Sequence, residues 1–280
     1  MSKIEWTDKT WNPVVGCSVV SPGCTNCYAM RTAARIVAMN IGRHAPHAPT
    51  PGEIPASHYY GLTQPSKAGP VWTGRVSLAP EHVLLAPLKR RKPTVYFVNS
   101  MGDLFHEAVP NAWIDRVFAV MALAPQHQFV VLTKRAKRMR EYMTNGALYD
   151  RVLRAAEPLR AERGELCRIP ISNPANVAFW PQLVLGVSVE RQPEADERIP
   201  ELLATPAAKH IVSLEPLLGE VDLEVAWYGE SALDGECWGE CAWCKQGFPP
   251  LHNCQEGRQS NAVANKGRSG LDGVIIGGES

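Results

Sequence analysis

Three cysteines near the N-terminus have a spacing that could hold a metal. Cys17, Cys24 and Cys27 are separated by six and by two residues. Three thiolates on one loop can occupy three corners of a metal centre and leave the fourth corner for substrate, cofactor or water. The spacing alone leaves three interpretations open: a zinc site completed by a distant His or Cys, an iron–sulfur cluster, and unliganded thiols.

A second group of cysteines lies near the other end of the chain. Its members are Cys237, Cys241, Cys244 and Cys254, in a segment rich in Gly, Ser and Asn. Four thiolates so close in sequence suit a structural tetrahedral zinc site, and an auxiliary iron–sulfur cluster is the alternative. The eighth cysteine, Cys167, stands alone and is most simply an isolated thiol.

The composition is that of an ordinary globular protein. The chain has 280 residues and a formal net charge of +1, with 45% hydrophobic and 20% charged residues. These values argue against a disordered tail protein, a collagen or a coiled coil. No long apolar run predicts a membrane span, and the N-terminus lacks the apolar stretch of a signal peptide. We therefore expect a cytoplasmic protein whose cysteines are ligands and not disulfides.

Buried strands are expected to alternate with helices along most of the chain. Apolar, β-branched runs predict strands at 11–15, 94–99, 128–133, 183–189, 210–214 and 273–276, with a further strand at 75–78. Helices are expected at 28–40, 111–124, 135–144, 147–163 and 194–204. This alternation indicates parallel strands in βα units. About seven such units favour an α/β fold of the full or partial (β/α) TIM-like barrel type.

Polar residues follow the predicted strands, where the active sites of such barrels lie. They are Asn99, Ser100, Asp103, Lys134, Ser188, Glu190 and Glu215. The carboxyl ends of parallel strands meet at one edge of the sheet, so we expect these side chains to bind a cofactor or substrate beside the first cysteine loop. Helix capping or loop hydrogen bonds are an equally good explanation for any one of them.

The regular alternation breaks in two places, which sets the predicted domain boundaries. Residues 1–226 are expected to form the barrel core, with a Pro- and His-rich irregular excursion at 41–70. Residues 227–270 are expected to be a Cys-rich metal-binding insertion, and 271–280 to carry the last barrel strand.

Several segments together resemble a known family. They are WTDKTWNPVVGCSVVSPGCTNCYAM, VYFVNSMGDLFHEAVP, VVLTKRAKRM, LGVSVE, HIVSLEPLLGEVDL and DGVIIGGES. In this order they resemble an uncharacterised phage and bacterial family related to radical S-adenosylmethionine proteins. The layout is also similar to spore photoproduct lyase, whose Ser/Asp/acid, Thr-Lys and Val-Ser motifs would correspond to Ser100, Asp103 and Glu107, Thr133–Lys134 and Val187–Ser188.

This resemblance implies a cofactor and an activity. Cys17, Cys24 and Cys27 would bind a [4Fe-4S] cluster, and S-adenosylmethionine bound to it would be cleaved, with one electron from a donor, to a 5′-deoxyadenosyl radical. The first gap departs from the usual pattern, since it has six residues where radical enzymes have three. The resemblance also implies that the chain ends before the last portion of the barrel.

Two basic runs suggest the substrate. One is Lys89–Lys92, and the other comprises Lys134, Arg135, Lys137, Arg138 and Arg140. They are interpreted either as solvated surface or as a phosphate-binding rim beside the barrel mouth. The second interpretation predicts DNA or RNA as a partner, and repair or modification of a nucleic-acid base as the reaction. The alternatives are a non-catalytic metal-binding phage accessory or nucleic-acid-binding protein, and a radical enzyme that acts on a peptide or small molecule.

Overall fold

A six-stranded parallel sheet forms the centre of the molecule. The computed structural model describes residues 6–44, 57–163, 180–223 and 271–276. The strands, in their order across the sheet, are β1 (Lys9–Trp11), β6 (Val95–Val98), β7 (Gln128–Thr133), β8 (Leu183–Ser188), β9 (Lys209–Leu214) and β10 (Gly273–Ile276). All five neighbouring pairs are parallel.

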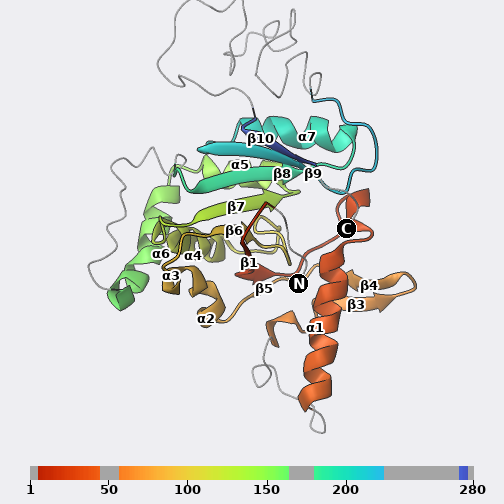
Figure 1. Ribbon diagram of the computed structural model, residues 1–280, viewed down its shortest axis with the longest axis horizontal. Coiled ribbons are helices and arrows are strands. Elements are labelled where there is room, and N and C mark those ends of the chain that lie inside the picture. Colours follow the sequence, from red (N-terminus) through yellow and green to blue (C-terminus); the bar gives the residue numbers. More distant parts are fainter. Residues whose placement is uncertain (1–5, 45–56, 164–179, 224–270, 277–280) are drawn as a thin grey trace, which may run out of the picture.

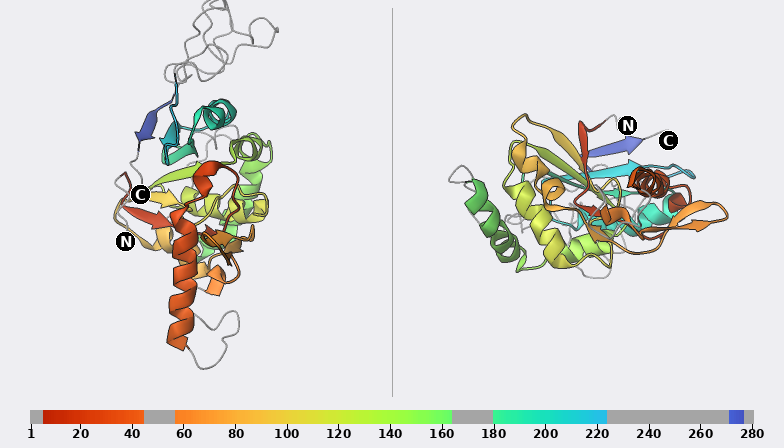
Figure 2. Two further views of the ribbon diagram at one scale, coloured as in Figure 1. Left: turned by 90° about the vertical axis from the view of Figure 1, so that its right-hand side faces the viewer. Right: turned by 90° about the horizontal axis from the view of Figure 1, so that it is seen from below.

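The order of the strands in the sheet is also their order in the chain. Each connection therefore steps to the next position in the same direction, and right-handed connections of this kind place their helices on one face. These helices are α4 (Asn111–Ala122), α5 (Ala136–Met143), α6 (Leu148–Arg163) and α7 (Gln192–Leu203). Figures 1 and 2 show them together on one side of the sheet. The sheet is thus wound in a single direction.

The main core lies between the sheet and these helices. Alternate residues of the central strands point into it, among them Phe129 and Val131 of β7 and Leu185 and Val187 of β8, all fully buried. Helix α4 contributes Ile114, Val117 and Phe118. The continuous apolar runs from which the strands were predicted are therefore explained by burial on both faces of the central strands.

The α/β prediction is confirmed, whereas the number of sheet strands and the closed form of the barrel are not. The described residues form an open sheet with β1 and β10 at its edges, and no closed barrel. The segment expected as a further barrel strand, 75–78, contains only β5 (Ser77–Leu78), which pairs antiparallel with β2 (Val14–Val15) outside the main sheet. The predicted strand 11–15 divides between β1 and β2 because Asn12 and Pro13 interrupt it.

Smaller elements surround the first connection. They are η1 (Pro22–Cys24), α1 (Tyr28–His44), η2 (Ser57–Tyr59), β3 (Thr63–Ser66), β4 (Gly69–Trp72), α2 (Glu81–Leu84) and α3 (Ala86–Lys89). Ala29, Met30 and Ala33 of α1 pack against Leu62 and Trp72. The excursion expected to be irregular over 41–70 thus contains the end of α1, and its described later part contains an antiparallel hairpin.

Several predicted features lie outside the described residues. The Cys-rich insertion with Cys237, Cys241, Cys244 and Cys254 is among them, as are Cys167 and residues 277–280. Among the helices that the structure describes, none has the length and apolar character needed to cross a membrane.

Candidate functional site

The first cysteine loop lies at the carboxyl edge of the sheet. It connects β2 to α1, and its first residue is fastened by a 3.0 Å hydrogen bond from the Gly16 N–H to the Met101 carbonyl oxygen, beyond the end of β6. Cys24 ends η1, and Cys27 immediately precedes α1. All three thiols are free, with Cys24 buried and the other two half-buried. The predicted position of this loop is therefore confirmed.

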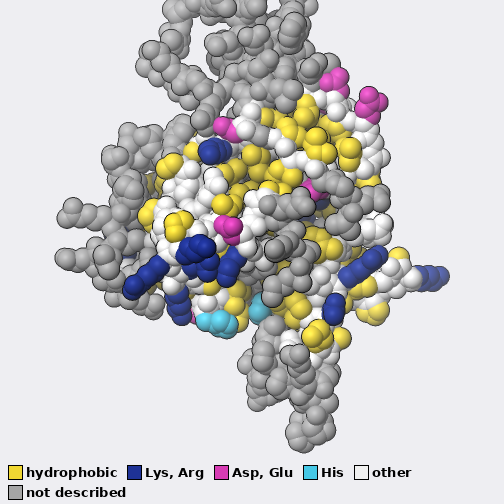
Figure 3. Space-filling view, viewed as in Figure 1, with side chains coloured by type: hydrophobic (Ala, Val, Ile, Leu, Met, Phe, Trp, Pro, Cys, Tyr) yellow, Lys and Arg dark blue, Asp and Glu magenta, His cyan; other side chains and the backbone are white. Residues whose placement is uncertain are grey.

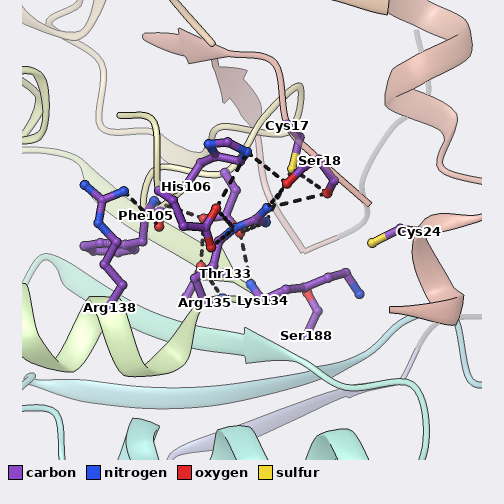
Figure 4. A network of polar contacts seen from close by, with 12 residues as sticks. Cys17, Ser18, Cys24, Phe105, His106, Thr133, Lys134, Arg135, Arg138 and Ser188 are labelled. Atoms are coloured by element: carbon purple, nitrogen blue, oxygen red, sulfur yellow. Dashed lines mark hydrogen bonds and ion pairs between the residues drawn. The ribbon is translucent and has the colours of Figure 1, made fainter. Parts of the chain in front are cut away.

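Arg135 ties the start of the cysteine loop to the ends of β6 and β7. Its Nη1 donates to Asp103 Oδ2 at 3.1 Å and to Cys17 Sγ at 3.4 Å, and its Nη2 donates to Ser18 Oγ at 2.7 Å. Its Nε lies 3.2 Å from both carboxylate oxygens of Glu107. His106 Nε2 also contacts Ser18 Oγ, at 2.9 Å. Figure 4 shows Cys17 and Ser18 facing this guanidinium across the network.

Asp103 is held in place by neighbours of its own. Its Oδ1 accepts hydrogen bonds from Thr133 Oγ1 at 2.7 Å and from the Phe105 N–H at 2.9 Å. Its Oδ2 accepts from the Lys134 N–H at 3.1 Å as well as from Arg135. A buried carboxylate that accepts this many hydrogen bonds is fixed in position and orients the guanidinium that it pairs with. Asp103 therefore serves as the support for Arg135.

Glu190 holds the middle of the cysteine loop. Its side chain is fully buried, and its Oε1 accepts from Ser21 Oγ at 2.7 Å and pairs with Lys134 Nζ. Its Oε2 accepts from Arg198 Nη1 at 2.9 Å. The loop passes so close that a Cβ at Gly23 would lie 2.4 Å from Glu190 Cγ. Only glycine permits this approach, so the loop is seated directly on the Glu190 carboxylate.

The environment shifts the pKa values of the cysteines in different directions. Burial and the charge of Asp103 raise the pKa of Cys17 to about 12, against the opposing effect of Arg135. Burial also acts to raise the pKa of Cys24, but a hydrogen bond with the Val20 backbone and the charge of Lys134 outweigh it, so this pKa is lowered. Burial lowers the pKa of Lys134 to about 8, although the charges of Cys24 and Cys27 oppose the shift. Lys134 therefore lies within electrostatic range of two of the three thiols.

Three of the predicted cofactor-binding residues are occupied by partners within the protein. Asp103, Lys134 and Glu190 all belong to the ion pairs that hold the loop. Their side chains support the cysteine loop, and the expectation that they contact a cofactor stays a prediction. The ion pairs form because acidic and basic residues that follow different strands meet at one edge of the sheet.

The other four predicted residues keep unused polar groups at the same edge. Ser100 Oγ donates to Asn12 Oδ1 at 3.2 Å and keeps lone pairs for a further donor. Asn99 has a φ of 61° and a buried side chain, and its Nδ2 has no hydrogen-bond partner among the described residues. Val187 and Val189 point into the core under the helices, so Ser188 between them faces the side without helices. Glu215 Oε2 accepts from Ser213 Oγ at 3.0 Å, and its charge reaches Tyr28 beside Cys27.

The donor chemistry of the loop fits an iron–sulfur cluster. Across the described ranges, no three His, Cys, Asp or Glu side chains are already gathered as a metal site. The loop nevertheless supplies three free thiols, and Lys134 and Arg135 bring positive charge to them. Thiolates are the ligands that iron–sulfur clusters use, and neighbouring cations offset their charge. The residues present therefore fit such a group.

The two basic runs lie at opposite edges of the sheet. Lys89–Lys92 precede β6 and so lie at its amino edge, whereas the second run follows β7 at the carboxyl edge. In the second run, Arg138 donates to the Val109 carbonyl oxygen and Arg140 pairs with Glu201. Only the second run therefore lies beside the cysteine loop, and most of its members have internal partners. The phosphate-binding rim stays a prediction. Figure 3 shows Lys and Arg side chains gathered over the region of α3.

Sequence reasoning missed four members of the site: Ser18, Ser21, His106 and Arg198. Their contacts join segments that are distant in sequence; Ser21 and Glu190, for example, are 169 positions apart. The presence of Ser18 and Ser21 within the cysteine loop was the only available signal, and it did not identify their partners.

Comparison with known proteins gives a family but no activity. A family model described as "Protein of unknown function (DUF5131)" matches residues 1–280. Neither the search of curated proteins nor the search of solved structures finds a match. The function must therefore be inferred from the site itself.

Proposed function

Because the chain belongs to the DUF5131 family, whose function is unknown, we start from its own site and propose that it is a radical S-adenosylmethionine-type iron–sulfur enzyme. The observation that carries this proposal is the placement of three free thiols on one loop at the carboxyl edge of a parallel sheet wound in a single direction. The open sheet would be the partial form of the (β/α) barrel that such enzymes use.

The cysteine loop would hold the cluster, and neighbouring residues would support the loop. Cys17, Cys24 and Cys27 would ligate three irons of a [4Fe-4S] cluster. Once bound, the cluster would supply the electron that cleaves S-adenosylmethionine and so generates a hydrogen-abstracting 5′-deoxyadenosyl radical. Arg135 and Glu190 hold the start and the middle of the loop, and Lys134 adds positive charge beside Cys24 and Cys27.

The residues with unused polar groups would bind S-adenosylmethionine. Glu215, Ser188 and Ser100 offer oxygen acceptors to its amino and ribose hydroxyl groups, and Asn99 Nδ2 can donate to its carboxylate. All four end or follow strands of the same sheet at the edge where the cysteine loop lies. This assignment differs from the sequence prediction because Asp103, Lys134 and Glu190 support the loop instead of binding the cofactor.

The substrate that we propose is a nucleic-acid base. Its support is the exposed basic run before β6, in which Lys89, Arg91 and Lys92 are exposed and could contact phosphates. For the Cys237–Cys254 group we propose a structural zinc site, and an external electron donor would be the other partner.

The test is anaerobic reconstitution followed by cofactor cleavage. The wild-type protein should take up iron and sulfide, and with dithionite it should convert S-adenosylmethionine to 5′-deoxyadenosine. Cys17→Ala, Cys24→Ala and Cys27→Ala should each lose most of the iron at this site, whereas the control Cys167→Ala should keep it. Zinc binding without any iron uptake would overturn the proposal.

A second stage of the same experiment addresses the substrate. Production of 5′-deoxyadenosine should increase with DNA or RNA and stay constant with peptide. An increase with peptide alone would replace the nucleic-acid base as substrate and leave the radical chemistry in place.

A further inference from the structure

Among the described residues, Cys17 has one cationic hydrogen-bond donor, and several partners fix that donor in place. Arg135 Nη1 lies 3.4 Å from the Cys17 sulfur, and the Arg135 side chain is only 5% exposed. The thiol itself donates to the Ser18 carbonyl oxygen at 3.5 Å, and Cys17 also packs against the apolar cluster around α1. The guanidinium therefore links this sulfur to the ends of β6 and β7.

The guanidinium cannot easily turn away from the cysteine. Asp103 and Glu107 hold it from the β6 side, and two contacts to Ser18, at 2.7 Å to Oγ and 3.5 Å to the carbonyl oxygen, hold it from the loop side. Its planar fork uses all three nitrogens in these bonds, which a lysine ammonium could not reproduce. The contact between Arg135 and Cys17 is thus fixed by the surrounding hydrogen bonds and ion pairs.

From this geometry we infer that Arg135 is a positioning residue for Cys17 and that it raises the reduction potential of the cluster bound there. The inference rests on the proposed function, because it concerns a thiolate that ligates iron. Reduction adds negative charge to the cluster and its sulfur ligands, and a hydrogen bond from a cation stabilises that charge. Asp103 and Glu107 balance the charge of the guanidinium at long range, so the directed hydrogen bond is the effect that Arg135 adds at the sulfur.

The direct test is the midpoint potential of the reconstituted cluster, followed by electron paramagnetic resonance during redox titration. At the midpoint potential of the wild type, Arg135→Gln should lower the ratio of reduced to oxidised cluster about tenfold, which is about 59 mV for a one-electron couple. Arg135→Lys should recover little of this difference. An unchanged potential in a fully loaded Arg135→Gln protein would overturn the inference.

Arg138 supplies the matched control. It lies on α5, the helix that begins directly after Arg135, and bonds to the carbonyl oxygens of Phe105 and Val109, in the same segment after β6. Within the described ranges it makes no hydrogen bond to the cysteine loop. Arg138→Gln should therefore leave the potential unchanged. An equal shift in both variants would show a general charge effect and would also overturn the inference.

A metal-free measurement separates this inference from the proposed function. In the protein without iron, hydrogen exchange of residues 16–21 should accelerate in Arg135→Gln but not in Arg138→Gln. Ser18→Ala, a milder change that removes the 2.7 Å bond, should accelerate the same amides if Arg135→Gln does not fold. If the wild type takes up no iron, the proposed function fails and the effect on potential fails with it. The hydrogen-exchange data still test whether Arg135 positions the cysteine loop. Unchanged exchange in the variants would refute that role.

Discussion

At the scale of single residues, the site depends on buried charges that satisfy one another. Glu190 is fully buried and faces Lys134, Arg198 and Ser21. Removing one member of such a group leaves the other charges buried without a partner, which is more destabilising than losing a surface ion pair. We therefore expect the carboxylates of this site to contribute to the free energy of unfolding, whatever their part in the chemistry.

Glu190→Gln should lower the free energy of unfolding by about 3–5 kcal/mol, because Lys134 and Arg198 would face a neutral amide. The control is Glu81→Gln, since Glu81 is 55% exposed and pairs with the half-buried Arg116. That change should lower stability by less than about 1 kcal/mol. Urea denaturation of both metal-free variants provides the measurement, and equal losses would contradict the assigned role of Glu190.

Cys17 should be slow to react with iodoacetamide in the metal-free protein. Burial and Asp103 raise its pKa to about 12, from 9.0. At pH 9 the native chain should therefore carry roughly 500-fold less thiolate at this residue than the unfolded chain does. Mass spectrometry of the alkylated peptide checks this, with the protein in urea as control.

The same shift has a consequence for stability. The folded chain keeps the Cys17 proton between pH 9 and about 12, whereas the unfolded chain releases it. Fewer bound protons in the unfolded state mean that stability falls as pH rises through this window. The loss should be smaller in Cys17→Ala, as thermal unfolding at pH 8 and pH 10 would show; an equal loss in both proteins would argue against the shifted pKa.

At the scale of elements, the neighbouring strands β7, β8 and β9 pack closely around a glycine in β8. Gly186 of β8 lies between Leu132 of β7 and Ile211 of β9. A Cβ at this position would lie 2.6 Å from a side-chain carbon of each neighbour and 2.7 Å from the Ile211 carbonyl oxygen. The strands that position Lys134, Glu190 and Glu215 therefore keep their spacing because residue 186 is glycine.

Gly186→Ala should destabilise the protein by about 1–3 kcal/mol, because the added methyl group overpacks this contact. Gly146→Ala is the matched control, since nothing lies within 4 Å of a Cβ at that position. Thermal unfolding should show a lower midpoint for Gly186→Ala only. A midpoint equal to that of Gly146→Ala would mean that the strands separate at little cost.

Strands with buried faces are predicted well from the sequence. Strands that depend on pairing with a neighbour are predicted poorly. The runs at 128–133 and 273–276 match β7 and β10 residue for residue, since strands with buried faces require continuous apolar residues. The β3–β4 hairpin could not be foreseen, because Pro65 and Pro70 interrupt the pattern and face each other in the ladder. The same contrast holds for the site. The location of Cys17 after the first strands was predictable from the sequence, but its contact with Arg135 depends on tertiary packing.

At the scale of the whole molecule, the basic run Lys89–Lys92 and the cysteine loop lie at opposite ends of the strands. β6 has four residues and β7 six, so about 13–20 Å of strand separates the two edges. At about 3.4 Å per nucleotide, a bound strand of roughly four to six nucleotides could span this distance. The proposed nucleic acid would thus be bound at one edge and modified at the other.

Changing Lys89, Arg91 and Lys92 together to Gln should weaken binding of duplex DNA. The slope of log affinity against log salt concentration should fall by up to about 2.7, because about three phosphate contacts would be lost. Lys137→Gln, a single exposed change on α5 at the other edge, is the control. Fluorescence anisotropy at several salt concentrations gives the slopes, and an unchanged slope would exclude this surface as the phosphate contact.

The hydrogen bond between the cysteine loop and Glu190 also affects when the loop can be anchored during translation. Ser21 and its partner Glu190 are 169 positions apart, so the ribosome makes the three thiols long before the residue that seats their loop. At roughly 5–20 residues per second, the interval is about ten to thirty seconds. During that time the nascent thiols are without their carboxylate support. Iron delivered early would encounter an unanchored loop, so assembly of the proposed cluster is expected to follow translation of β8.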